Sequence, residues 1–157
     1  MSSKLRCVVL CLLMLALVSL PSGGQPAARR LPTVTAMQVY KSPTCGCCGK
    51  WVDHVKAAGF APEVHDVADL SPVKTNGGVP PDLQSCHTAI IGGYAIEGHV
   101  PADVIRQLLA EKPRIAGIAV PGMPIGSPGM EMGARKDAYE VIAFTKDGKT
   151  SVYARRP

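Results

Sequence analysis

The strongest constraint on this chain is a cluster of three cysteines within four residues, formed by Cys45, Cys47 and Cys48. Residues 37–40, just before the cluster, alternate as a strand does, and residues 51–58, just after it, carry apolar side chains at helical spacing. A cluster between the end of a strand and the start of a helix lies where backbone N–H groups and the helix dipole favour negative charge. Because the thiolate is the form that attacks disulfides and binds metals, this pattern indicates a thiolate site, for a metal or for redox chemistry.

The N-terminal 24 residues have the pattern of a secretory signal peptide, with two basic residues, an apolar run over 7–20 and a small-residue exit. The apolar run is shorter than the roughly 20 residues that a transmembrane helix needs, so an uncleaved anchor is the less favoured alternative. We expect cleavage between residues 21 and 28, a flexible leader over 25–34 and a single domain over 35–157. The mature protein is then expected to be periplasmic and free of the membrane.

Charge and cysteine count narrow the function of the mature chain. Signal removal takes away Lys4 and Arg6, which lowers 17 basic residues to 15 against 12 acidic ones and the net charge from +5 to +3. This mild charge does not indicate nucleic-acid binding. The cysteines that remain are Cys45, Cys47, Cys48 and Cys86. Four cysteines in an exported protein usually form two structural disulfides, but crowding of three of them would make at least one bridge very tight.

The rest of the pattern predicts an α/β fold with helices packed on a sheet. The predicted elements, in order, are a strand over 36–41, a helix from 47 or 48 to 58, a strand over 63–67, a loop with room for one helical turn over 68–85, a hairpin over 88–96, a helix between Pro101 and Pro113, a loop over 117–134 and a hairpin over 139–153. Two-residue turns at Gly92-Gly93 and Asp147-Gly148 are typical of hairpins.

The spacing of Cys45 and Cys48 resembles the C-x-x-C motif of the thioredoxin fold. In thioredoxins and glutaredoxins the redox pair faces a loop that ends in a cis-proline, just before a strand. Counting back from the Gly-Gly turn places His87 at that proline position, with Cys86 just ahead of it. The resemblance implies a thioredoxin-like central mixed sheet with flanking helices, plus the C-terminal hairpin. It also implies that residues 97–99 lie at the mouth of the site, at the start of the next helix.

Four segments of the chain together resemble the CopG-type family of exported copper-resistance proteins, a metal-binding group with a thioredoxin-like domain. These segments are 41–48, 85–88, 97–101 and 120–131. The resemblance implies a copper site built on the four cysteines, for which a multinuclear, thiolate-bridged cluster is one form.

Ligand chemistry supports copper independently, since soft thiolates and thioethers select Cu(I), zinc or iron–sulfur clusters over hard cations. Cys45 and Cys48 can approach one ion from the first turn of the helix, whereas Cys47 points roughly 100° away and suits a second ion. A closed zinc site normally draws on paired C-x-x-C motifs, and this chain has one.

Histidines and loop methionines extend the candidate ligand set. Neutral imidazole suits copper. The methionine thioethers in the Gly/Pro-rich loop have three alternative roles: soft copper ligands, a hydrophobic lid, or side chains that fill irregular gaps. The predicted metal ligands are Cys45, Cys47, Cys48, Cys86, His87, His99, Met123 and Met130.

Two functions from different classes follow. The first is a periplasmic copper-resistance protein that sequesters Cu(I) or cycles it between Cu(I) and Cu(II), with a chaperone that delivers copper to an exporter or oxidase as a weaker variant. The second is a thiol–disulfide oxidoreductase in which Cys45 attacks and Cys48 resolves. We favour copper binding over an enzyme, because His87 replaces the expected proline and a third thiol at Cys47 would scramble a two-cysteine cycle. Redox activity on copper stays open.

Overall fold

The computed structural model describes residues 36–157, all of which belong to one compact unit. The predicted signal peptide over 1–24 and the leader over 25–34 lie outside the described residues. Within the part of the chain that the structure describes, no helix is both long and apolar enough to cross a membrane.

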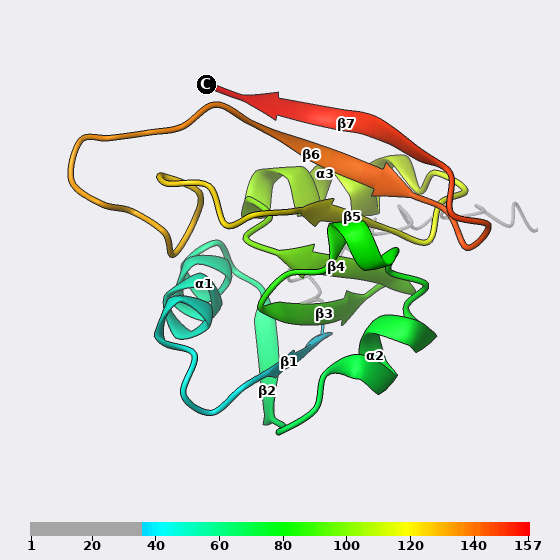
Figure 1. The fold of residues 1–157 in the computed structure, drawn as a ribbon, viewed down its shortest axis with the longest axis horizontal. Helices are drawn as coiled ribbons and strands as arrows, with labels where there is room; N and C mark the ends of the chain where they lie inside the picture. Colours follow the sequence, from blue (N-terminus) through cyan, green and yellow to red (C-terminus); the bar gives the residue numbers. More distant parts are fainter. Residues whose placement is uncertain (1–35) are drawn as a thin grey trace, which may run out of the picture. The chain divides into compact units, whose positions relative to one another are not determined.

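A seven-stranded mixed sheet forms the centre of the fold, with the strand order β2-β1-β3-β4-β5-β6-β7 (Figure 1). Strands β1 and β2 pair in parallel, as do β4 and β5, and the other neighbours are antiparallel. The strands are β1 (Ala36–Lys41), β2 (Ala61–Asp66), β3 (His87–Ile91), β4 (Tyr94–Gly98), β5 (Gly117–Val120), β6 (Tyr139–Phe144) and β7 (Thr150–Arg156). The helices are α1 (Gly46–Ala57), α2 (Ser71–Asn76) and α3 (Ala102–Glu111), with a 3-10 turn at Pro81–Leu83. The predicted α/β class, with a mixed sheet and helices, is confirmed.

The predicted strand–cysteine turn–helix unit is present. Strand β1 buries Met37 and Val39 on one side, and Cys45 is the residue that precedes the first turn of α1. The helix buries Trp51 and Val55 against the sheet because apolar residues recur on one face. Helix α1 therefore presents the cysteines at its N-terminal end, as the sequence predicts.

Both predicted hairpins are confirmed. Strands β3 and β4 join through Gly92 and Gly93, whose φ angles of +58° and +86° are the positive values that a two-residue turn requires. Strands β6 and β7 form the second hairpin and extend the same sheet from β5. The C-terminal hairpin is thus part of the central sheet.

Two predicted loops contain regular structure. The prediction of a loop over 117–134 is wrong for its first residues, because Gly117–Val120 form β5, paired with β4 and β6. All four residues of β5 are buried, so its side chains show no alternation that a sequence pattern could reveal. The loop predicted over 68–85 holds α2 as well as the 3-10 turn, which is more than the one helical turn expected.

Successive residues of the inner strands pack on opposite faces of the sheet. On one face, α1 and α3 cover a core that includes Ile96 and Ile118. On the other face, a smaller core contains Ala95, Ala119 and Phe144, next to the segment that follows α2. The cysteines lie at the edge of the larger core, where α1 begins.

Candidate metal centre

Four sulfur atoms lie together at the N-terminal end of α1. The Sγ atoms of Cys45, Cys47, Cys48 and Cys86 are all within 4.8 Å of one another. Cys45 and Cys48 are joined as a disulfide, and the Sγ of Cys47 is 3.5 Å from that of Cys45. Cys47 and Cys86 are free. The described residues thus hold one disulfide between near neighbours, in place of the spread pair of bridges that a structural framework would use.

Sheet register explains why Cys86, 38 residues after Cys48, joins this cluster. Strand β1 ends at Lys41, which pairs with His87 at the start of β3. The chain turns from β1 into α1 through a hydrogen bond from the Cys45 N–H to the Ser42 carbonyl, 3.1 Å long. The cysteine turn and Cys86 are therefore carried by adjacent antiparallel strands at the same edge of the sheet.

A second ligand group shares Cys86 with the first. The donor atoms of Cys86, His87 and His99 also lie within 4.8 Å of one another. The Cys86 Sγ is 3.4 Å from the Nδ1 of His87 and 3.1 Å from the Nε2 of His99. His99 follows the end of β4, which pairs with β3, so the hairpin brings both imidazoles to one thiol.

Hydrogen bonding sets the tautomer of His99. Its Nδ1 lies 2.7 Å from the Pro128 carbonyl, which can only accept, so Nδ1 carries the proton. The lone pair on Nε2 then points at Cys86. A histidine held in this way by a backbone carbonyl is oriented as metal-binding histidines usually are.

His87 is fully buried and neutral. Burial is the main reason that its pKa falls to about 3, and nearby His99 and Lys74 lower it further. Its Nε2 is the one buried side-chain nitrogen or oxygen without a hydrogen-bond partner among residues 36–157. An unpartnered buried imidazole nitrogen costs free energy unless a ligand satisfies it, which fits a metal ligand.

Cys86 is a half-buried thiol. Burial, followed by the nearby Cys47 thiol, raises the pKa of Cys86 to about 11. Without a metal this side chain is therefore protonated at neutral pH. A metal that binds it must displace the proton, and the thiol is a poor spontaneous nucleophile.

The loop after β5 closes over the cysteine turn. This loop supplies the Pro128 carbonyl that holds His99. Its next residue, Gly129, packs so closely on α1 that an added Cβ would lie 2.7 Å from the Cys47 carbonyl oxygen and 2.9 Å from the Trp51 backbone nitrogen. The loop holds its shape through hydrogen bonds such as that from the Met130 N–H to the Ser127 carbonyl, 2.8 Å long. Figure 1 shows the loop after β5 beside α1.

The predicted methionine ligands differ in placement. Met130 is half-buried and directly follows Gly129 in the closing loop. Met123 is 41% exposed, in the turn after β5. Their roles as ligands stay predictions.

One predicted placement is wrong, and one residue of the site was missed. Glu97 was expected at the mouth of the site, at the start of a helix, but it lies inside β4 and is completely buried. Its partner is Lys74 of α2, whose Nζ lies 2.5 Å from the Glu97 Oε1. Lys74 stands in a stretch that reads as a polar loop, so no periodic signal could have marked it. The available sequence signal was Glu97, an acidic residue next to apolar residues of a strand.

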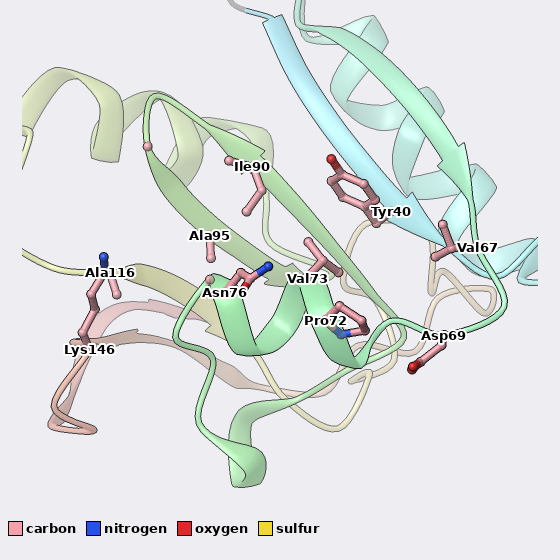
Figure 2. A pocket seen from close by; sticks show the side chains of 12 residues that line it. Tyr40, Val67, Asp69, Pro72, Val73, Asn76, Ile90, Ala95, Ala116 and Lys146 are labelled. Atoms are coloured by element: carbon pink, nitrogen blue, oxygen red, sulfur yellow. The ribbon is translucent and has the colours of Figure 1, made fainter.

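A separate pocket has a volume of about 620 Å³. It lies on the α2 side of the sheet (Figure 2). Tyr40, Val73, Asn76 and Lys146 are among its lining residues. None of the predicted metal ligands lines it.

The fold and the site together define an α/β protein whose clustered thiols and imidazoles suit a soft metal ion. Residues 83–130 match a family model described as a protein of unknown function, DUF411. No curated protein matches the chain. A solved structure titled "Copper resistance protein copG- Form 2" is 49% identical, with a TM-score of 0.74, and covers 78% of this chain and 98% of its own. The Form 1 structure is 50% identical, with a TM-score of 0.74, and covers 78% of this chain and 97% of its own.

The chain belongs to the family of the copper resistance protein CopG. This membership and the cysteine cluster support a copper-related role.

Proposed function

We propose that this protein is an exported, periplasmic copper-binding protein that protects against copper by holding Cu(I). The observation that carries the proposal is the convergence of four sulfur atoms within 4.8 Å, with two buried imidazoles joined to them through Cys86. Thiolates and neutral imidazoles are the donors that Cu(I) prefers among protein side chains. The proposed ligands are Cys45, Cys47, Cys48, Cys86, His87 and His99, with Met123 and Met130 as added thioether donors.

Cys86 supports a site for more than one ion. It belongs to both the four-sulfur group and the group with His87 and His99. A thiolate shared between two ligand sets can bridge two soft ions, so we propose a multinuclear, thiolate-bridged cluster. The Nε2 lone pair of His99 and the imidazole of His87, whose Nδ1 lies 3.4 Å from the Cys86 Sγ, add nitrogen donors beside Cys86.

Cys45 and Cys48 cannot bind copper as thiolates while they are joined as a disulfide. A disulfide sulfur is not a thiolate, so an external dithiol, itself oxidised to a disulfide in the exchange, must supply two electrons and release both sulfurs before they bind copper. The site thereby couples thiol redox state to copper loading. Loss of one electron from bound Cu(I) to an external electron acceptor would give Cu(II), which favours imidazoles over sulfurs; the presence of both donor types at one site supports the proposed Cu(I)/Cu(II) cycling.

The second candidate is a thiol–disulfide oxidoreductase of thioredoxin-like fold, and the disulfide across the C-x-x-C spacing is the observation that favours it. In this case Cys45 would attack and Cys48 would resolve. One feature favours copper instead: a third thiol, that of Cys47, lies 3.5 Å from the Sγ of Cys45, where it would scramble a two-cysteine cycle.

We propose one thioredoxin-like domain over 35–157 behind a cleaved signal peptide, with a copper exporter or oxidase as the partner.

The test is an anaerobic Cu(I) titration of the reduced protein against a chromophoric chelator, with metal analysis. Wild type is expected to bind more than one Cu(I) tightly, and both Cys47→Ser and Cys86→Ser are expected to lose copper. His65→Gln, which changes a histidine in β2 outside both ligand groups, is the matched control and should bind as wild type does. Absence of tight copper, together with disulfide reductase activity that survives Cys86→Ser, would establish the oxidoreductase instead.

A further inference from the structure

We propose that the buried Lys74–Glu97 ion pair is the positioning device for the copper ligands of β3 and β4, Cys86, His87 and His99. This inference rests on the proposed function, and it assigns a role to two residues outside both ligand groups. Lys74 and Glu97 are positioning residues, because neither contacts the proposed ligands directly.

Glu97 ties down both residues that flank the Cys86–His87 pair. Its Oε1 accepts a hydrogen bond from the Ser85 N–H, 2.6 Å long, and its Oε2 accepts one from the Thr88 hydroxyl, 2.7 Å long. One carboxylate thus fixes the backbone just before the ligand pair and the side chain just after it. Thr88 of β3 is also the residue that pairs with Glu97 of β4, so the hydrogen bond between their side chains joins directly opposite residues of neighbouring strands.

Lys74 reaches the same two flanking residues from α2. Its Nζ donates to the Ser85 carbonyl at 2.9 Å, to the Thr88 hydroxyl at 3.1 Å and to the Glu97 carboxylate at 2.5 Å. Three acceptors match the three donors of an ammonium group. The side chain of Lys74 is 7% exposed and that of Glu97 is 0% exposed, so both charges are removed from solvent together.

The network also fixes the segment that leads to His99. Gly98, between Glu97 and His99, has a φ of +70°, and an added Cβ would lie 2.7 Å from both the Ser85 side chain and the Val120 carbonyl. The end of β4 therefore rests against Ser85, the residue that Lys74 and Glu97 hold. The position of His99 relative to Cys86 follows from this packing.

A general stabilising role would not require this arrangement. A buried ion pair adds little net stability over apolar side chains of similar volume, because both charges must be desolvated. Its directional bonds instead specify one position for Ser85 and Thr88. Hydrogen-bond partners of the ligands themselves typically change metal affinity by about 10- to 100-fold when they are removed. The Lys74–Glu97 pair acts one contact further out, so we expect an effect at the lower end of that range.

The experiment measures Cu(I) affinity of the reduced protein by chelator competition and the copper–imidazole signal by X-ray absorption. The single variants are Lys74→Met and Glu97→Gln. The double variant Lys74→Met/Glu97→Met leaves no unpaired buried charge, so it serves as the test if a single variant does not fold. Leu108→Ala, which opens a cavity under α3 away from the cysteines, is the control for lost stability alone.

We expect the pair variants to bind Cu(I) about 10-fold more weakly than wild type and to lose copper–imidazole signal, while Leu108→Ala keeps both. Wild-type affinity and signal in the folded double variant would overturn the positioning role and leave the copper site intact. If wild type itself binds no Cu(I) tightly, the proposed function fails, and this inference fails with it. Weaker binding with an unchanged imidazole signal would also contradict it, because His87 and His99 would then be positioned without the pair.

Discussion

Gly129 is the point where the loop after β5 presses on the metal site, and Gly129→Ala tests that contact. An alanine Cβ would lie 2.7 Å from the Cys47 carbonyl oxygen, 2.9 Å from the Trp51 nitrogen and 3.3 Å from the His99 Nδ1. The first two are backbone atoms of α1, which cannot rotate away. The loop must therefore lift, which also pulls the Pro128 carbonyl from His99.

The structure provides a control with the same backbone angle. Gly93 has a φ of +86°, as Gly129 does, but an added Cβ at Gly93 meets nothing within 4 Å. The left-handed conformation costs an alanine about 1–2 kcal/mol at either position. Overpacking adds about 1–3 kcal/mol at Gly129 alone. We therefore expect Gly93→Ala to lower the free energy of unfolding by about 1–2 kcal/mol and Gly129→Ala by about 2–5 kcal/mol.

Denaturant unfolding of both variants measures the difference, and a Cu(I) titration of the reduced proteins measures its effect on the site. Gly129→Ala should also weaken copper binding by about 10-fold or more, since the hydrogen bond that orients His99 is strained. Gly93→Ala should bind as wild type does. Equal losses of stability in the two variants, with equal copper affinity, would refute the close packing of the loop on α1.

Three further predictions concern the ligands themselves. Oxidised protein with the Cys45–Cys48 disulfide intact should bind fewer Cu(I) ions than reduced protein. Metal analysis of copper bound by the oxidised protein, and by the same protein after re-reduction, checks this. His99→Gln should weaken Cu(I) binding by about 10-fold or more, because its Nε2 faces Cys86, and an unchanged chelator competition curve would contradict it. Met130→Leu should weaken Cu(I) binding with stability changed by less than about 1.5 kcal/mol, whereas Met132→Leu, at a side chain that is 63% exposed, should do neither.

Local chemistry accounts for the parts of the fold that could be predicted. The cysteine turn, α1 and both hairpins depend on residues close together in sequence, such as the Gly92-Gly93 turn with its positive φ angles. Strand β5 could not be predicted because it is buried on both faces and shows no alternation. Helix α2 is short and polar, so no apolar periodicity marks it, and its Lys74 contacts a residue of β4 that is far away in the chain.

The sequence by itself determined the candidate chemistry: the three clustered cysteines, the distant Cys86-His87 pair and the family resemblance all follow from residue types and spacing. Tertiary structure decided which of these groups meet. The pairing of Lys41 with His87 brings Cys86 to the helix start, and the β3–β4 register brings His99 to Cys86. Such contacts depend on strand register between segments far apart in the chain, which a local pattern does not specify. For the same reason the buried Lys74–Glu97 pair became visible only once α2 and β4 were placed side by side.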